Sequence, residues 1–220
     1  MIKYLFIIFL FFNLNSGLFA QTAPPFWNDI KNFKTRDSTQ KIPEHPILFT
    51  GSSSFTMWTG VNADFPGYSI VNNAFGGSTL VDVIRYVYDI ILPYQPKQVV
   101  IYCGENDLAS SDTVTSAEVV KRFKTLFGMI RINLPDAIIS FVSMKPSPSR
   151  ERIQGKVKVA NAAIRTFIKT QRKAQFIDVY NPMLDAKGKM REELYLPDRL
   201  HMKPTGYAIW KKIILPFLLK

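Results

Sequence analysis

Short apolar runs of strand length alternate along the chain with longer segments whose apolar residues recur at helical spacing. The β-prone runs lie at residues 46–51, 67–78 (a strand and its loop), 98–103, 137–142 and 175–180. The segments with helical spacing lie at residues 79–92, 115–133, 157–169 and 204–220. Such alternation is typical of repeated βαβ units with right-handed crossovers. We therefore expect an α/β protein with a five-stranded parallel sheet between two layers of helices.

The predicted helices carry their own boundary signals. Pro93 and Pro96 end the helix over residues 79–92, since proline cannot continue a helix. Thr115 and Glu118 have the spacing of a capping box at the start of the next helix. With the elements placed in this way, every loop that carries candidate chemistry follows a strand. All of these loops should therefore meet at one edge of the sheet.

The first 20 residues differ from the rest of the chain. Lys3 is followed by an apolar block over residues 4–12 and then by small and polar residues up to Ala20, a pattern typical of a secretory signal peptide. The block is short for a membrane span, so an uncleaved anchor is the less favoured interpretation. We expect a secreted or periplasmic protein, with a polar leader over residues 21–45 that packs on a single domain over residues 46–220.

Basic residues outnumber acidic residues by 28 to 17, and one of them, Lys3, lies in the signal segment. Without that segment the formal net charge is +10, which favours association with anionic envelope surfaces. The basic residues are spread along the chain without a nucleic-acid-binding motif, so nucleic acid is not an expected partner. The only cysteine, Cys103, lies outside the signal segment, which excludes an intramolecular disulfide and a lipid-attachment cysteine near the cleavage point.

A cluster of hydroxyl groups follows the first predicted strand, where Gly51 is followed by Ser52, Ser53 and Ser54. In open α/β sheets, ligands bind beyond the carboxyl ends of the strands. Serine is also a favoured N-cap residue where a helix begins, so the cluster alone favours capping over catalysis. A catalytic role for these serines requires a base and oxyanion donors in later loops, so those loops distinguish the two interpretations.

A serine nucleophile needs a base, usually a histidine that is oriented by a carboxylate. Of the two histidines, His45 precedes the first strand and would lie at the opposite edge, whereas His201 lies in the loop before the last helix. Asp198 can accept the Nδ1 proton of His201 and leave Nε2 free to face a serine. A structural loop histidine fits this short pattern as well. A zinc site would need carboxylates such as Asp107 and Asp198, and it is disfavoured because the chain offers few nitrogen or sulfur ligands.

Two further loops carry groups that can stabilise an oxyanion. Gly76 and Gly77 let the backbone approach a ligand and present an N–H group, and Asn106 adds a side-chain amide after the third strand. Each feature has a common structural explanation, a tight turn for the glycines and an Asx turn for Asn106. Their occurrence after successive strands favours a functional site.

Four short blocks occur along the chain in this order: residues 51–55 (GSSSF), 72–78 (NNAFGGS), 104–107 (GEND) and 198–201 (DRLH). Together they resemble the sequence blocks of the SGNH (GDSL-type) hydrolase superfamily, over a match that runs from about Pro46 to the C-terminus. They look closest to secreted bacterial GDSL-like lipases or acylhydrolases. The resemblance implies a flavodoxin-like α/β/α sandwich and serine-esterase chemistry that needs no metal and no cofactor.

The same resemblance implies a role for each matching residue. Ser53 would be the nucleophile that forms the acyl-enzyme, His201 the general base and then the general acid, and Asp198 its orienting partner. The N–H groups of Ser53 and Gly77 and the side-chain amide of Asn106 would form the oxyanion hole.

Two positions depart from the family pattern. Ser52 stands in place of the aspartate of the name motif, and Ala74 in place of a glycine that is often found in the second block. Neither change removes a group that transfers a proton or stabilises the oxyanion. We therefore expect activity, with altered support around Ser53.

The predicted loops are short and polar, and no long apolar lid interrupts the chain. This favours short acyl groups on hydrophilic alcohols, in a general esterase or acylhydrolase or, as an alternative, in a carbohydrate O-deacetylase. Lys145 and Arg150, in the loop after the fourth strand, are candidates for contact with an anionic part of a substrate, although solvated side chains fit them too. The alternative from another class is a catalytically silent protein that binds glycans or the cell envelope.

Overall fold

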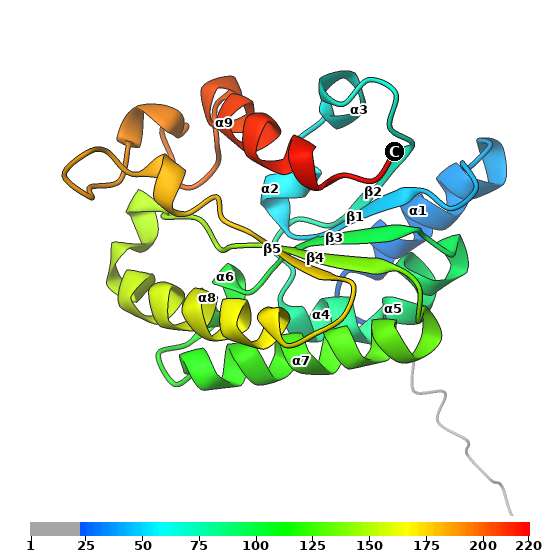
Figure 1. The fold of residues 1–220 in the computed structure, drawn as a ribbon, viewed down its shortest axis with the longest axis horizontal. Helices are drawn as coiled ribbons and strands as arrows, with labels where there is room; N and C mark the ends of the chain where they lie inside the picture. Colours follow the sequence, from blue (N-terminus) through cyan, green and yellow to red (C-terminus); the bar gives the residue numbers. More distant parts are fainter. Residues whose placement is uncertain (1–22) are drawn as a thin grey trace, which may run out of the picture.

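Five parallel strands form one sheet in the order β2-β1-β3-β4-β5 (Figure 1). The structure is a computed structural model that describes residues 23–220, so the predicted signal peptide lies outside the described residues. The strands are β1 (Ile47–Gly51), β2 (Ile70–Ala74), β3 (Gln98–Tyr102), β4 (Ile138–Val142) and β5 (Ala174–Ile177). The central strands β1 and β3 are buried along their whole lengths, as strands covered on both faces must be.

Helices cover both faces of the sheet, as Figure 1 shows, and this confirms the predicted three-layer α/β fold. On one side lie α4 (Leu80–Arg85), α5 (Val87–Ile90), α6 (Glu105–Ser110), α7 (Ser116–Asn133) and α8 (Gln154–Lys169). On the other side lie α2 (Ser53–Thr56), α3 (Val61–Asp64) and α9 (Pro204–Ile214). Short 3-10 turns occur at η1 (Leu92–Tyr94), η2 (Pro148–Ile153), η3 (Asn181–Met183), η4 (Glu192–Leu194) and η5 (Leu215–Phe217).

The three strands that lead to the candidate site end at the same level. Gly51, at the end of β1, is aligned with Ala74 of β2 on one side and with Tyr102 of β3 on the other. The loops that follow these strands therefore start at one edge of the sheet. Side chains that are distant in the sequence can meet there.

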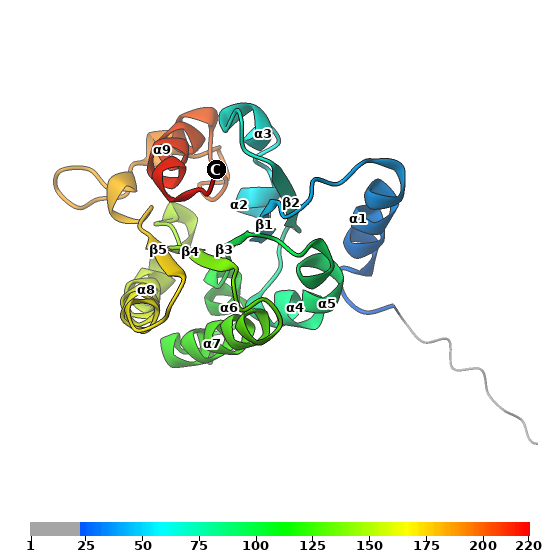
Figure 2. The same ribbon diagram turned by 45° about the vertical axis from the view of Figure 1, so that its right-hand side comes forward.

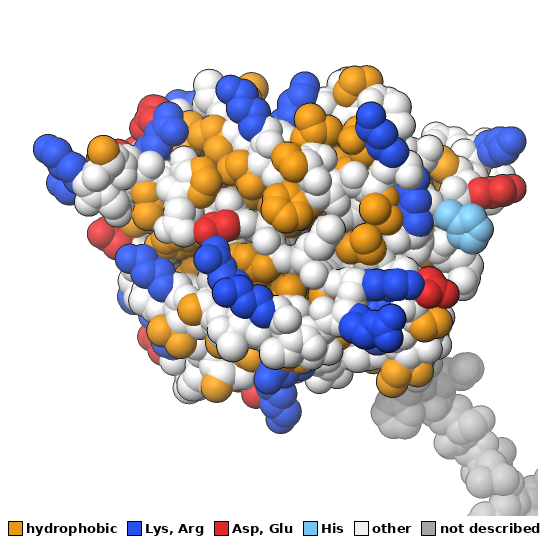
Figure 3. Space-filling model, viewed as in Figure 1, with side chains coloured by type: hydrophobic (Ala, Val, Ile, Leu, Met, Phe, Trp, Pro, Cys, Tyr) orange, Lys and Arg blue, Asp and Glu red, His pale blue; other side chains and the backbone are white. Residues whose placement is uncertain are grey.

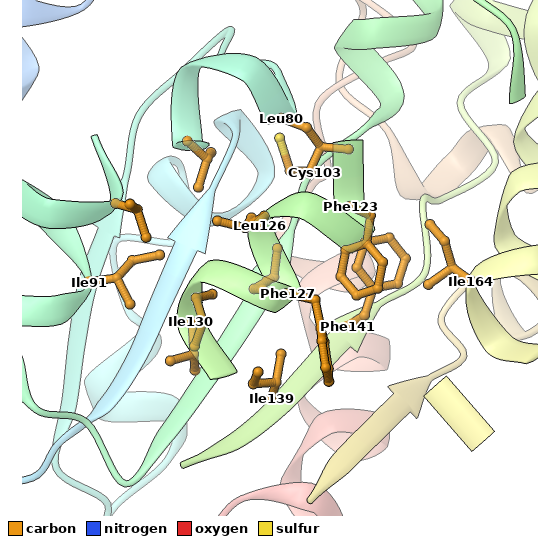
Figure 4. Packing of buried hydrophobic residues seen from close by; sticks show 14 of the residues in the cluster. Leu80, Ile91, Cys103, Phe123, Leu126, Phe127, Ile130, Ile139, Phe141 and Ile164 are labelled. Carbon is orange, nitrogen blue, oxygen red and sulfur yellow. The ribbon is translucent and has the colours of Figure 1, made fainter. Parts of the chain in front are cut away.

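Each helical layer buries its own apolar core against the sheet. On the α7 side, Figure 4 shows Phe123, Phe127 and Ile130 of α7 together with Ile139 and Phe141 of β4. The ring centroids of Phe123 and Phe141 are 4.7 Å apart. Full burial of a large apolar side chain stabilises a fold by roughly 1.5–3 kcal/mol, so this layer holds its side of the sheet firmly.

The core on the opposite face is aromatic and lies directly under the candidate nucleophile. Trp210 of α9 packs against Phe55 of α2, with ring centroids 5.9 Å apart, and against Tyr102 of β3, with ring centroids 4.9 Å apart. Because Phe55 is two residues after Ser53 and Tyr102 ends β3, this cluster fixes the start of α2 on the sheet.

The leader contributes one helix, α1 (Trp27–Thr39), which lies beside β2 at the edge of the molecule (Figures 1 and 2). Arg36 holds it there by donating from Nη2 to Asn73 Oδ1 at 2.8 Å and from Nη1 to Asn72 O at 3.3 Å. Ahead of the helix, the Phe26 ring packs on Phe75, with centroids 5.2 Å apart. The leader thus covers the edge strand β2, next to the loop that follows it, and shields an edge that would otherwise be open.

Several expectations about helix boundaries were wrong. The helix predicted over residues 204–220 ends at Ile214 and is followed by the 3-10 turn η5. The predicted single helix over residues 79–92 is broken at Tyr86, whose backbone leaves the helical region while its hydroxyl donates to Pro25 O at 2.6 Å. The leader therefore holds this residue in place, a contact that helical spacing cannot reveal. At Thr115 only half of the capping box forms, because the side chain of Glu118 pairs with Arg122 at 3.1 Å instead.

The fifth strand is shorter than predicted. It ends at Ile177, whereas the β-prone run continues to Tyr180. Asp178 turns the chain there, since its Oδ1 accepts from the backbone N–H of Tyr180 at 3.0 Å.

On the face shown in Figure 3, the lysine and arginine side chains are dispersed among apolar and neutral ones and do not form one continuous basic patch. Within residues 23–220, no helix has both the length and the hydropathy needed to cross a membrane.

Candidate active site

The backbone after β1 brings Ser53 to the edge of the sheet. Gly51 has φ +124°, and a Cβ atom at this position would lie 1.9 Å from Tyr102 O, so only glycine fits. The next N–H group, that of Ser52, donates to the same carbonyl at 3.0 Å. The helix then begins at Ser53, and Ser52 is its N-cap residue without a capping hydrogen bond from the side chain.

Ser53, His201 and Asp198 form a continuous hydrogen-bonded chain. His201 Nε2 lies 3.1 Å from Ser53 Oγ, and His201 Nδ1 lies 2.6 Å from Asp198 Oδ2. The other carboxylate oxygen of Asp198 accepts from the backbone N–H groups of Leu200 and His201, both at 2.9 Å. The loop therefore orients its own histidine toward the serine, as the three-residue spacing of Asp198 and His201 allows.

The electrostatics of this loop keep Asp198 ionised. Partial burial raises its pKa, but the hydrogen bonds from the backbone of Leu200 and His201 and from the His201 ring outweigh burial and lower the pKa to about 2. A carboxylate that stays charged can stabilise a protonated imidazole beside it. The side chain of His201 is itself mostly covered, with 24% of its surface exposed.

The loop after β2 passes directly beside Ser53. A Cβ atom on Gly76 would lie 3.9 Å from Ser53 Cβ, and Gly77 has φ +82°, which favours glycine. Ser78 fixes the end of the loop by donating from Oγ to Gly51 O at 2.9 Å. Within the described part of the chain, neither the Ser53 N–H nor the Gly77 N–H donates a hydrogen bond, so both are free to bind an oxyanion.

Asn106, at the start of α6, ties the loops together. Its Nδ2 donates to Ser52 Oγ at 2.6 Å and to Ser78 O at 2.9 Å. Ser52, which departs from the family motif, thus contacts the amide that is the third oxyanion candidate. The amide oxygen of Asn106 accepts from Arg150 Nη2 at 2.7 Å, a contact that no sequence pattern indicated.

Asp107, one of the two carboxylates considered for a zinc site, supports the same region. Its buried carboxylate accepts from Leu80 N at 2.9 Å and from Arg122 Nη1 at 2.8 Å. It therefore joins the start of α6 to the start of α4, which follows the glycine loop. Among residues 23–220, no group of three or more histidine, cysteine, aspartate or glutamate side chains is placed to hold a metal ion.

The two candidate substrate contacts lie at different depths. Lys145 is only 1% exposed, and its Nζ binds Glu105 Oε2 at 3.0 Å and Ser147 Oγ at 2.9 Å, so the structure places it in a buried ion pair instead of at the surface. Arg150 is partly exposed, and its Nη2 donates a hydrogen bond to Asn106 Oδ1.

His45 lies away from these groups. It is exposed, and its Nδ1 lies 2.9 Å from Gln95 O in the loop that leads into β3. This places His45 at the amino ends of the strands, the opposite edge from Ser53.

Comparison with known proteins agrees with the fold and with the sequence blocks. The model of the GDSL-like Lipase/Acylhydrolase family matches residues 43–209. A GDSL-like lipase from Bacteroides thetaiotaomicron is similar in structure, with 22% identity, a TM-score of 0.73, and coverage of 86% of this chain and 96% of that one. For a lipase/acylhydrolase from Enterococcus faecalis the identity is 21%, the TM-score 0.62, and the coverage 78% and 94%.

A third similar structure is a catalytic mutant of an acetylxylan esterase from Geobacillus stearothermophilus, with 14% identity, a TM-score of 0.63, and coverage of 80% of this chain and 95% of that one. A search of curated proteins gave no significant match. At these identities the structures show a shared fold, while the family match extends over most of the chain. The chain therefore belongs to the GDSL-like lipase/acylhydrolase family of the SGNH superfamily, a family of ester-hydrolysing enzymes.

Proposed function

We propose that this protein is a serine acylhydrolase that cleaves carboxylic esters through an acyl-enzyme on Ser53. The observation that carries the proposal is the chain from Ser53 Oγ through His201 to Asp198, with distances of 3.1 Å and 2.6 Å. The adjoining loops carry the Ser53 and Gly77 N–H groups, which donate to no group among the described residues, and the Asn106 amide, which contacts the neighbouring Ser52. These are the parts that acyl transfer requires: a nucleophile, an oriented base and donors for the oxyanion.

In the acylation step, Ser53 Oγ attacks the ester carbonyl carbon while His201 Nε2 takes the hydroxyl proton. Asp198 stabilises the imidazolium that forms. When the tetrahedral intermediate collapses, His201 gives the proton to the leaving alcohol. In deacylation, His201 takes a proton from the water molecule that attacks the acyl carbon. When the second tetrahedral intermediate collapses, His201 returns this proton to Ser53 Oγ, so that the acid and the free Ser53 hydroxyl are released.

The oxyanion of each tetrahedral intermediate would accept from the Ser53 and Gly77 N–H groups and from Asn106 Nδ2. Both protons of Nδ2 already have partners, at Ser52 Oγ and Ser78 O. The oxyanion would therefore share or replace the Ser52 contact, because Ser78 O holds the amide to the glycine loop. Ser52 thus keeps the amide aimed at the site between turnovers.

Short acyl groups, acetyl above all, are the substrates we propose. The structural similarity to an acetylxylan esterase supports this proposal, as does the lack of a long apolar lid insertion in the sequence. A carbohydrate O-deacetylase is the second candidate because that similar protein acts on an acetylated glycan. The two candidates share one mechanism and differ only in the alcohol that leaves.

An ester panel on the purified protein tests the proposal. Chromogenic acetyl, butyryl and octanoyl esters rank acyl length, and acetylated xylan against a simple aryl acetate ranks the alcohol. We expect the highest kcat/KM with acetyl esters, and none with any ester for Ser53→Ala. A protein that hydrolyses no ester although it is folded would support the silent binding alternative.

A further inference from the structure

A buried polar cluster lies directly behind Asn106. Glu105, the residue before it, is 4% exposed and accepts at Oε2 from Tyr102 OH at 2.7 Å and from Lys145 Nζ at 3.0 Å. Its other oxygen, Oε1, is buried without a hydrogen-bond partner and faces Arg150 Nη1 at 3.5 Å. Burial raises the pKa of Glu105, but the charges of Lys145 and Arg150 outweigh burial and hold the pKa below its usual value. The cluster therefore contains an ionised carboxylate with a fixed position.

Arg150 lies between this carboxylate and the amide of Asn106. One terminal nitrogen faces Glu105, and the other donates to Asn106 Oδ1 at 2.7 Å. A guanidinium is planar and rigid, so the ion pair between one nitrogen and the Glu105 carboxylate restricts the direction of the other nitrogen. The two contacts together define where Asn106 Oδ1 lies.

The backbone of the same segment is anchored on both sides. Arg150 N donates to Ser147 O at 2.9 Å, and Ser149 N donates to Arg199 O at 3.0 Å, within the loop that carries Asp198 and His201. The segment therefore connects the base loop with the oxyanion side. Its arginine is only 21% exposed, which limits its freedom to move away.

The contact has two consequences for the Nδ2 group of Asn106. It opposes a flip of the carboxamide, because a flipped amide would point nitrogen at the guanidinium and oxygen at Ser78 O. It also draws electron density toward Oδ1, which makes the Nδ2 protons stronger donors. Both effects act on the group that would bind the oxyanion.

We propose that Arg150 is a positioning residue that holds and polarises the Asn106 carboxamide for transition-state stabilisation. This inference rests on the proposed function. It differs from a substrate-binding role, in which the guanidinium would act on the ester itself and independently of Asn106.

A double-mutant cycle tests this inference. Steady-state kinetics on an aryl acetate are measured for wild type, Arg150→Ala, Asn106→Ala and the double variant. We expect Arg150→Ala to lower kcat on the order of tenfold with KM nearly unchanged, and to change kcat less than about twofold once Asn106 is absent. Equal effects in both backgrounds, or a rise in KM alone, would overturn the inference and assign Arg150 to substrate contact.

Two additions keep the cycle interpretable. Guanidinium at millimolar concentration should restore part of the kcat of Arg150→Ala and none of that of Asn106→Ala; equal responses would contradict the positioning role. Arg152→Ala is the matched control, since this nearby arginine is 66% exposed and pairs with Asp112 at the surface. If Arg150→Ala does not fold, Arg150→Lys takes its place, with a smaller loss of kcat expected.

Failure of this inference can be told apart from failure of the proposed function. Ser53→Ala is assayed in the same series. If it is inactive while the effects of Arg150 and Asn106 are additive, only the positioning role is lost. If Ser53→Ala keeps full activity, the acyl-enzyme proposal fails first.

Discussion

The two sides of Ser53 are built in different ways. The base side is a single exposed loop, in which Asp198 and His201 are three residues apart and are held mainly by their own backbone. The oxyanion side combines loops from three strands, and behind Asn106 it rests on the buried pair of Glu105 and Lys145. We therefore expect changes on the base side to affect mainly chemistry, with only a small effect on stability, and changes on the oxyanion side to affect both chemistry and stability.

The largest effect is expected at the nucleophile and the base. Ser53→Ala and His201→Ala should each lower kcat by a factor on the order of 10⁴ or more, because neither attack nor proton transfer can then proceed normally. Thermal unfolding should change little, since both side chains lie at the surface of the site. Rates on an aryl acetate and melting curves measure the two quantities.

The controls for these variants come from the same chain. His45→Ala removes the other histidine, which is exposed at the opposite edge, and Ser38→Ala removes an exposed hydroxyl on α1. Both should keep wild-type kinetics. A His201→Ala enzyme with near-normal turnover would end the assignment of the base.

The next effect concerns stability on the oxyanion side. Lys145→Met leaves the carboxylate of Glu105 buried beside fewer partners, which should lower the free energy of unfolding by about 3–5 kcal/mol. Chemical denaturation measures this loss. A matched change of an exposed pair, Lys173→Met opposite Asp136, should leave the denaturation midpoint close to that of the wild type, because surface ion pairs contribute little to stability. Equal losses for the two variants would refute the contrast between the buried and exposed regions.

At Asn106 we expect a loss of turnover with little change in KM. Asn106→Ala should lower kcat by roughly 10² to 10³, because one oxyanion donor is removed, while KM changes little. Steady-state kinetics on the aryl acetate give the split between the two constants. A kcat within twofold of wild type would remove Asn106 from the oxyanion hole.

The smallest effect is the contribution of Asp198 to acid stability. Its folded-state pKa of about 2 lies below the ordinary value of 3.8, so it stabilises the fold above about pH 4 and loses that contribution as pH falls toward 2. The exposure of the carboxyl keeps the contribution small. Melting temperatures of wild type and Asp198→Asn should converge between pH 4 and pH 2, and a constant difference over this range would contradict the assignment.

The sequence predicts those features that leave a periodic or local signal. Alternating apolar runs gave the parallel sheet, and loops after the strands gave the edge at which Ser53 and His201 meet. The break at Tyr86 leaves no local signal, and the hydrogen bond of its hydroxyl to Pro25 O joins residues that are far apart in the chain.

The contacts of Arg150 and Lys145 could not be predicted for a related reason. Their partners are about 40 residues away, at Asn106 and Glu105, and a basic residue in a polar loop has the same pattern whether it is solvated or buried. Only the fold shows that the guanidinium lies on the amide and that the ammonium is enclosed.

The central claim is that Ser53 carries the acyl group, and covalent labelling tests it most directly. The purified protein is treated with a fluorophosphonate probe, and the adduct is located by peptide mass spectrometry, with Ser53→Ala as the matched sample. We predict one adduct on Ser53 in the wild type and none in the variant. Labelling of another residue, or equal labelling of both proteins, would contradict the account.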